Sequence, residues 1–239
     1  MSKERLNFKE RWPGPELMDD PACDEVLLLR TVDQFRSINR LVGRYRTVLK
    51  RLVLDDMARQ PDRAYHFIDL GAGGCDIPVW LLGAARRRGL KLRVTALDGD
   101  ERIVAHARRI CAGVEGLEIH HAQLADLHRF GPVDYLYMNH VLHHLPDDII
   151  PGVLQAMHQA ARRRWIVSDL LRSPWAYLGF HFLGIFYRRS FAFEDGLCSI
   201  RRGFKPTELL AHAASIDKGT HIMSLTPGRL ILTGSKNPP

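Results

Sequence analysis

Three histidines and one aspartate follow apolar runs of the chain, at places where side chains could do acid–base chemistry. His140, His143 and His144 stand in the segment YMNHVLHHLPDD, and Asp169 ends the segment WIVSD. An imidazole takes up a proton near neutral pH, and a carboxylate that holds one ring nitrogen fixes its tautomer. The pattern predicts that His143 or His144, oriented by Asp169, accepts a proton from a substrate.

Two alternatives to this catalytic role stay open on the residues alone. The histidines could pack, or line a ligand pocket, without taking a proton. They could also bind a metal, but the H-x-x-H-H spacing has no acidic partner nearby. We therefore expect no metal.

A second group of residues forms a glycine-rich loop in the segment FIDLGAGGCDIP. Glycines let a backbone turn sharply and approach a ligand closely, and a helix that begins there offers free N–H groups. A dinucleotide-binding loop would need Gly or Ala at position 76, but Asp76 would repel a pyrophosphate there. The Gly-Lys-Ser/Thr of a P-loop is absent. Asp69, two residues before the first glycine, is suited to organising the loop and meeting a cationic or amine-bearing ligand.

The elements that must hold these residues alternate between strands and helices, which is typical of a doubly wound sheet. Apolar runs predict parallel strands over 65–70, 92–97, 117–122, 133–138 and 165–168, with helices over 76–88, 101–112 and 148–163. Two further strands, 221–225 and 229–233, flank Thr226-Pro227-Gly228, a hairpin signal. We predict an α/β fold with a mostly parallel seven-stranded sheet that closes with an antiparallel C-terminal hairpin. Open sheets of this kind bind ligands at the carboxyl ends of their strands, where the histidines and glycines stand.

The N-terminal region differs from this alternating pattern. Residues 1–60 are predicted to form a helical lead-in or cap, and residues 61–239 the main domain. The first 24 residues are polar and read as extended. From there to about Met57, apolar residues recur at helical spacing, which predicts one long helix or two abutting helices.

An insertion at about 170–205 is rich in aromatic side chains. With the N-terminal helices it is expected to form a lid over a pocket for an aromatic or lipophilic acceptor. Two alternatives stay open. The aromatic side chains could pack on the sheet, or residues 175–189 could make a weak contact with a membrane surface, because Arg188 and Arg189 border the apolar stretch.

The composition is that of an ordinary globular protein, with 46% hydrophobic and 26% charged residues. The net charge of +7 would suit an anionic partner. However, runs of three arginines at 86–88 and 162–164 fall at predicted helix ends, where the helix dipole favours them. Four separated cysteines without a C-x-x-C pair favour the reducing cytoplasm, and the sequence shows no signal-peptide or membrane-spanning run.

The loop and the strand that follows it resemble class I S-adenosylmethionine-dependent methyltransferases. The segment DLGAGGC is similar to the family's first motif, D/E-x-G-x-G-x-G, with Cys75 in place of the third glycine. Asp98 ends the second predicted strand, where an acidic residue of the family accepts both ribose hydroxyls. The resemblance implies S-adenosyl-L-methionine as the cofactor, and it implies contacts from Asp69, Gly71, Ala72, Gly73, Cys75, Asp98 and Gly99.

Later segments extend the resemblance in the order of the family. The segment HHAQLADL is similar to the stretch that faces adenine, which implies this role for the amide of Gln123 and the backbone N–H of Leu124. The YMNHVLHHLPDD segment closely resembles the small-molecule branch, including quinone-biosynthesis methyltransferases, and implies that Asn139 and His140 bind the cofactor. DGLCSIRRGF is similar to methyltransferases of polyketide and quinone pathways. The resemblance implies methylation of a small aromatic or lipophilic acceptor in secondary metabolism, at a phenol, quinol or polyketide-like hydroxyl, with a His base.

Other functions are weighed against this one. The positive charge invites a nucleic-acid methyltransferase acting on RNA or DNA, but no Asn/Asp-Pro-Pro-aromatic segment follows the fourth strand and no Pro-Cys occurs. Asp76 disfavours an NAD(P)-binding oxidoreductase. A cofactor-binding subunit without activity is a further alternative. The oligomeric state stays open, as does the choice among oxygen, carbon and nitrogen as the methylated atom.

Overall fold

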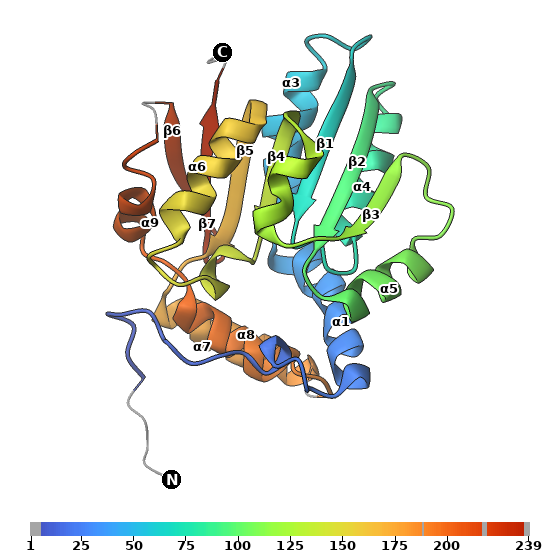
Figure 1. The fold of residues 1–239 in the computed structure, drawn as a ribbon. Helices are drawn as coiled ribbons and strands as arrows, with labels where there is room; N and C mark the ends of the chain where they lie inside the picture. The colour runs from blue at the N-terminus through green and yellow to red at the C-terminus, as the bar shows by residue number, and fades with distance from the viewer. Residues whose placement is uncertain (1–5, 188, 217–218, 237–239) are drawn as a thin grey trace.

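The computed structural model describes residues 6–187, 189–216 and 219–236, so Arg188 lies outside the described residues. Seven strands form one sheet in the order β3-β2-β1-β4-β5-β7-β6 (Figure 1). The first five strands are parallel, and β7 is antiparallel to both β5 and β6. The mostly parallel sheet with an antiparallel C-terminal hairpin is confirmed.

The strands and helices follow the predicted alternation closely. The strands are β1 (Ala64–Leu70), β2 (Lys91–Asp98), β3 (Leu117–His121), β4 (Val133–Asn139), β5 (Ala161–Leu170), β6 (Thr220–Leu225) and β7 (Arg229–Ser235). The helices are α1 (Glu25–Val42), α2 (Tyr45–Leu49), α3 (Asp55–Met57), α4 (Asp76–Arg86), α5 (Glu101–Ile110), α6 (Ile150–Ala160), α7 (Pro174–Gly184), α8 (Ala192–Arg202) and α9 (Pro206–His212).

The core lies on both faces of the sheet because successive strand residues point to opposite sides. Phe67 of β1 and Tyr135 of β4 pack with side chains of α2 and α4 on one face. Their neighbours Ile68 and Leu136 pack with side chains of α6 and α9 on the other. Every residue of β4 is buried, as a central strand covered on both faces requires.

One predicted helix ends earlier than expected. The helix predicted over 148–163 stops at Ala160, and the arginines at 162–164 lie in β5. They are ordered by sheet pairing, with Arg164 opposite Tyr135 on one side and Ser235 on the other. The helix-dipole explanation of this arginine run is therefore wrong. The side chain of Arg163 instead forms an ion pair with Asp56.

The N-terminal region forms two abutting helical segments, as one of the two predictions allowed. They part at Gly43 and Arg44, where Arg44 has a positive φ of 55°. Before α1 the described chain contains a short 3-10 helix at Leu17–Asp19 and a turn at 21–22, and no strand. This segment, α1, α7 and α8 lie together below the lower edge of the sheet in Figure 1. None of the helices in the described ranges is long and apolar enough to cross a membrane.

Candidate functional site

A deep cleft opens at the carboxyl ends of the parallel strands. Its volume is about 940 Å³, near the upper end of the usual range for ligand pockets. The glycine loop and the ends of β2 and β4 line one side, and the N-terminal segment, α1, α7 and α8 line the other. Most of the predicted site residues line this cleft: Asp69, Gly71, Ala72, Gly73, Asp98, Gly99, Gln123, Leu124, Asn139, His140, His143 and His144.

The glycine loop is held by backbone contacts between the ends of β1 and β2. The N–H groups of Gly71 and Ala72 both donate to the carbonyl of Leu97, at 2.8 and 3.0 Å. Gly71 has a φ of 69°, and a Cβ there would overlap a methyl group of Val141. The position therefore requires glycine on two counts, backbone conformation and space.

Cys75 lies elsewhere than its predicted place among the cofactor contacts. It is fully buried, does not line the cleft, and packs with Ala72, Ala96, Ala107 and Cys111 behind the loop. Its φ of 56° lies in the left-handed region, which explains why the family motif has glycine at this position. The loop turns through this conformation just before α4 begins, which directs the thiol into the core.

Three carboxylates lie at the loop side of the cleft, of which Asp69 is buried and Asp76 and Asp98 are half-buried. Asp69 is 2% exposed, and burial together with the charges of Asp76 and Asp98 raises its pKa well above the usual range. Burial also raises the pKa of Asp76 to about 6 and shifts the pKa of Asp98 upward. Asp98 accepts from the N–H groups of Gly73 and Asp100, at 2.8 and 3.1 Å. Mutual repulsion of this kind is relieved by a cationic ligand and increased by an anionic one.

The far end of the same wall carries the predicted adenine contacts. The amide Nε2 of Gln123 donates to the carbonyl of Gly99 at 3.1 Å, so the two predicted contacts lie against each other. Gln123 also caps the short helix Leu124–Phe130 together with Asp126. This arrangement fixes the side chain of Gln123 at the cleft wall.

Asn139 ends β4 and His140 follows it, and both line the cleft. Asn139 accepts a hydrogen bond from the hydroxyl of Tyr137 at 3.3 Å. His140 has a φ of 58°, and its Nε2 accepts from Arg229. Burial, and then the charge of Arg229, hold the pKa of His140 well below its usual range, so this ring is neutral. Because Nε2 already accepts from Arg229, this nitrogen is not free to take a proton from a substrate.

His143 is the histidine that Asp169 orients. Its Nδ1 donates to Oδ1 of Asp169 at 2.6 Å, and its backbone N–H donates to Oδ2 at 3.2 Å. Its Nε2 lies 3.4 Å from a carboxylate oxygen of Glu16 and has no well-formed hydrogen bond among the described residues. Burial disfavours the charged ring, but Asp169 and Glu16 outweigh it and raise the pKa of His143 to about 9. Asp169 does not line the cleft and acts on it through His143.

His144 has a different partner. Its Nδ1 lies 3.0 Å from Oδ1 of Asp19, and its Nε2 lies 3.8 Å from Glu16. Its side chain is 24% exposed, against 1% for His143. The sequence left open whether Asp169 orients His143 or His144. The geometry favours His143, because Asp169 contacts only this one of the two.

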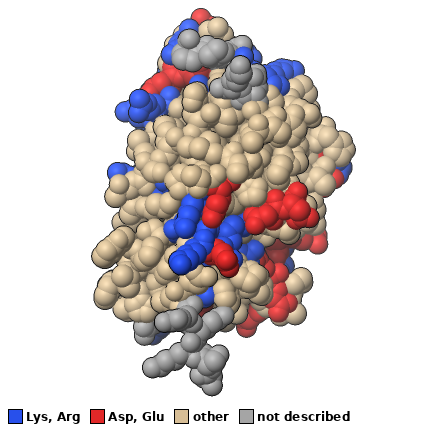
Figure 2. All heavy atoms as spheres, turned by 90° about the vertical axis from the view of Figure 1, so that its left-hand side faces the viewer, with Lys and Arg blue, Asp and Glu red and all other residues tan. Residues whose placement is uncertain are grey.

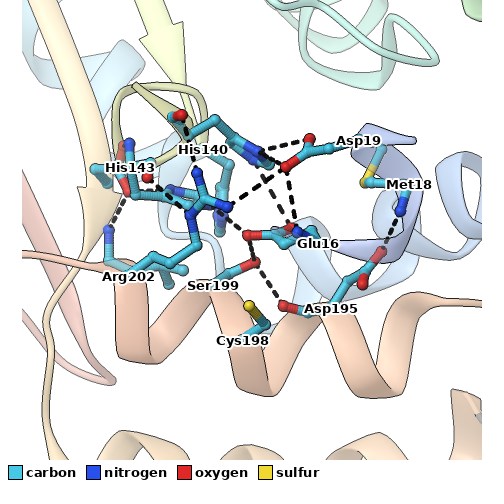
Figure 3. Close-up of polar contacts among 12 residues, drawn as sticks. Glu16, Met18, Asp19, His140, His143, Asp195, Cys198, Ser199 and Arg202 are labelled. Atoms are coloured by element: carbon cyan, nitrogen blue, oxygen red, sulfur yellow. Dashed lines mark hydrogen bonds and ion pairs between the residues drawn. The ribbon is translucent and has the colours of Figure 1, made fainter. Parts of the chain in front are cut away.

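Several residues of this wall were missed by the sequence reasoning. Figure 3 shows Glu16 between the histidines and Ser199 of α8, whose hydroxyl donates to Glu16 at 2.8 Å. Asp195 accepts from the N–H groups of Leu17 and Met18, at 2.7 and 3.0 Å. No periodicity or motif marks Glu16, since it lies in a polar segment that reads as a lead-in.

Arg202 ties the same segment to the histidine turn. Its guanidinium donates to the carbonyls of His143 and His144 at 3.1 and 2.9 Å, and to the carbonyl of Gly14 at 2.9 Å. Arg11 reinforces this contact by donating to the same His143 carbonyl at 2.8 Å. The N-terminal segment is therefore fastened over the cleft.

The histidine cluster has an acidic neighbour after all. Glu16, His143 and His144 offer one ligand atom each within 4.8 Å of one another, close enough to share a metal ion. The premise that no acidic residue accompanies the histidines is wrong. Each carboxylate of the cluster also has a partner among the described residues, because Glu16 and Asp169 flank His143 while Asp19 meets His144 and Arg202.

Comparisons with known proteins agree with this architecture. Residues 67–164 match the family described as "Methyltransferase domain". A comparison with curated proteins found no match.

Solved structures share the fold at low identity. A magnesium protoporphyrin IX methyltransferase from Synechocystis PCC 6803 is 16% identical with a TM-score of 0.51, covering 89% of this chain and 84% of that one. An O-methyltransferase family protein from Burkholderia thailandensis is 16% identical with a TM-score of 0.59, covering 85% and 59%. The plantazolicin methyltransferase BamL is 12% identical with a TM-score of 0.60, covering 87% and 90%.

Proposed function

We propose that the chain is a class I S-adenosylmethionine-dependent methyltransferase and that it methylates a hydroxyl of a small aromatic or lipophilic acceptor. A phenol, quinol or polyketide-like hydroxyl is the acceptor that the site suits best. The observation that carries the proposal is His143, which lines the cleft while Asp169 behind it holds Nδ1 of its ring.

The loop side of the cleft suits S-adenosylmethionine. The cofactor supplies a sulfonium methyl group that is open to in-line displacement. The carboxylates of Asp69 and Asp76 favour its positive charge, and the carboxylate of Asp98 is suited to the paired hydroxyls of a ribose. Gln123 and Leu124 would meet the adenine at the far end of the same wall.

His143 would remove the acceptor's proton. The O–H bond breaks, the proton passes to Nε2, and the oxygen's electron pair becomes free to attack the methyl carbon. Asp169 on Nδ1 leaves Nε2, which lies beside Glu16, as the nitrogen that would take the proton, and the two carboxylates stabilise the imidazolium that forms. A base with a pKa of about 9 is well matched to a phenol, whose pKa is about 10, and poorly matched to an aliphatic alcohol.

The other wall would form the acceptor's enclosure. Residues 1–60 would act as a cap and the 170–205 insertion as a lid, because α1, α7 and α8 line the cleft opposite the loop. Phe180 and Leu183 give this wall an apolar surface. The names of the similar structures include a porphyrin methyltransferase and an O-methyltransferase, which supports a small acceptor.

The test combines binding with turnover. S-adenosylhomocysteine is titrated by calorimetry, with NADH for comparison, and we expect binding of the first alone. The enzyme is then incubated with S-adenosylmethionine and a panel of phenols, quinols and polyketide-like lactones, and mass spectrometry with NMR locates the added methyl. Methylation of carbon or nitrogen alone would contradict the proposal.

Variants test the base. His143→Ala should lower turnover by about 10²- to 10⁴-fold and leave affinity for S-adenosylhomocysteine unchanged. His221→Ala, at an exposed position of β6, is the matched control. Near-normal turnover in both His143→Ala and His144→Ala would rule out a histidine base. Loss of activity on chelation, restored by a divalent cation, would assign the cluster to a metal instead.

A further inference from the structure

The helix α7 is apolar on two sides. Ala176, Phe180 and Leu183 turn toward the cleft, at the spacing of one helix face. The other side carries large side chains that are exposed to solvent: Trp175 (81%), Leu178, Phe182 (69%), Ile185 and Phe186 (82%), the last two in the turn that follows. A helix that is apolar all round is normally buried on all sides, and this one is covered on one side only.

The exposed side chains form a concentrated patch. Most other exposed large apolar residues among the described ones stand singly, as Val79, Ile110 and Leu210 do. Single residues of that kind need no explanation, whereas a contiguous apolar patch marks an interaction surface. Trp175 both lines the cleft and is exposed, so the patch reaches the mouth of the acceptor pocket.

The charged side chains of the patch segment itself are positive, and the first acidic residue after it is the exposed Glu194 of α8. The sequence from 173 to 193 contains no Asp or Glu. Arg189 is exposed at one end, where Arg30 donates to its carbonyl at 3.0 Å. Arg44 donates to the carbonyl of Thr226 at 2.7 Å, in the turn whose Gly228 approaches Ala176 of α7. In Figure 2, acidic side chains gather on the right, whereas the lower left, at the height of α7 in Figure 1, is uncharged.

These features fit the surface of an anionic bilayer better than they fit a protein. A short helix of 11 residues cannot span a membrane, but it can lie in the interface with its apolar side chains inserted. Tryptophan is favoured at that depth, and arginines beside it meet lipid phosphates. A protein partner would be expected to find polar groups to pair with, and the exposed stripe of Trp175, Leu178, Phe182 and Phe186 carries almost none.

We propose that α7 and the turn Ile185–Tyr187 dock on the surface of an anionic phospholipid bilayer, with the mouth of the cleft at Trp175 facing the lipid. The exposed stripe then enters the interface while Arg30, Arg44 and Arg189 lie at the level of the headgroups. One further step rests on the proposed function: a lipophilic acceptor reaches the cleft along α7 directly from the membrane, without crossing water.

The experiment is flotation of the whole enzyme with vesicles of phosphatidylcholine and phosphatidylglycerol. The double variant Phe182→Ser/Phe186→Ser should lower binding by about tenfold or more, since burial of one large apolar side chain already changes an equilibrium by that factor. The matched control is Ile149→Ser/Leu210→Ser, which removes exposed apolar residues elsewhere. Binding should fall on vesicles of phosphatidylcholine alone, and also in 1 M salt.

The outcomes separate this inference from the proposed function. Turnover of a water-soluble phenol without vesicle binding overturns the docking and leaves the methylation standing. Vesicle binding without turnover of any hydroxyl acceptor supports the docking and overturns the proposed methylation. Sedimentation of the wild-type enzyme and the Phe182→Ser/Phe186→Ser variant adds a third outcome. A dimer that the variant loses, with no vesicle binding, would make the patch an interface between copies and overturn the proposal.

Discussion

The two walls of the cleft are built in different ways. On the cofactor wall, contacts are local and use the backbone, as in the hydrogen bond from Gly73 to Asp98, 25 residues apart. On the acceptor wall, contacts join side chains distant in sequence, as between Ser199 and Glu16, 183 residues apart. The first wall is fixed by the way two strands end, whereas the second depends on a segment folding back over the sheet. Acceptor choice can therefore change while the cofactor wall stays as it is.

The largest effect is expected where the cofactor wall depends on glycine. In Gly71→Ala, the new Cβ must occupy the space of a Val141 methyl group at a φ that costs about 1–2 kcal/mol for a residue with a side chain. Affinity for S-adenosylhomocysteine, measured by calorimetry, should fall by about 100-fold or more.

Gly73→Ala is the matched control for that change. Gly73 also has a positive φ, of 52°, but a Cβ there would meet nothing within 4 Å. The backbone strain is thus similar while the clash is absent, and the loss of affinity should be near tenfold. Equal losses of affinity in the two variants would show that backbone strain alone, and not the clash with Val141, weakens cofactor binding.

The two walls should also titrate at different pH. Asp76 is charged above a pKa of about 6, so affinity for S-adenosylmethionine should weaken as the pH falls below that value. His143 carries its proton below a pKa of about 9, so turnover should rise about tenfold per pH unit from pH 7 and level off near 9. The residual turnover of a His143→Asn variant should not show this rise between pH 7 and 9. A single pH transition shared by cofactor binding and turnover would contradict the assignment of these two titrations to different walls.

A smaller effect is expected from the fastening of the N-terminal segment. Arg202→Gln removes the contacts to the carbonyls of His143, His144 and Gly14, and hydrogen bonds to charged groups contribute about 1.5–3 kcal/mol. The KM for the acceptor should rise by about tenfold, with affinity for S-adenosylhomocysteine unchanged. Arg86→Gln, which breaks an exposed ion pair with Glu115, is the control and should change neither quantity.

The sequence predicted the cofactor wall far better than the acceptor wall, for the same physical reason. Strand patterns and glycine positions are local, so the sheet and the placement of Gly71 and Asp98 at the cleft followed from short segments. Glu16 could not be found in this way, because its burial depends on contacts with α8 and the histidine turn. Arg162 and Arg163 were wrongly placed in a helix, because a run of arginines does not indicate whether it ends a helix or begins a strand.

The smallest effect on cofactor affinity is expected at Cys75, because its side chain lies behind the loop and lines neither wall. Cys75→Gly relieves a left-handed backbone strain of about 1–2 kcal/mol but removes a thiol packed against Ala96 and Cys111, so the melting temperature should change little. Cys75→Ala keeps the strain and loses the sulfur, so it should be the less stable of the two. Affinity for S-adenosylhomocysteine should stay within about twofold in both, because the side chain lies behind the loop. A tenfold change would mean that the cofactor wall depends on side-chain packing as the acceptor wall does.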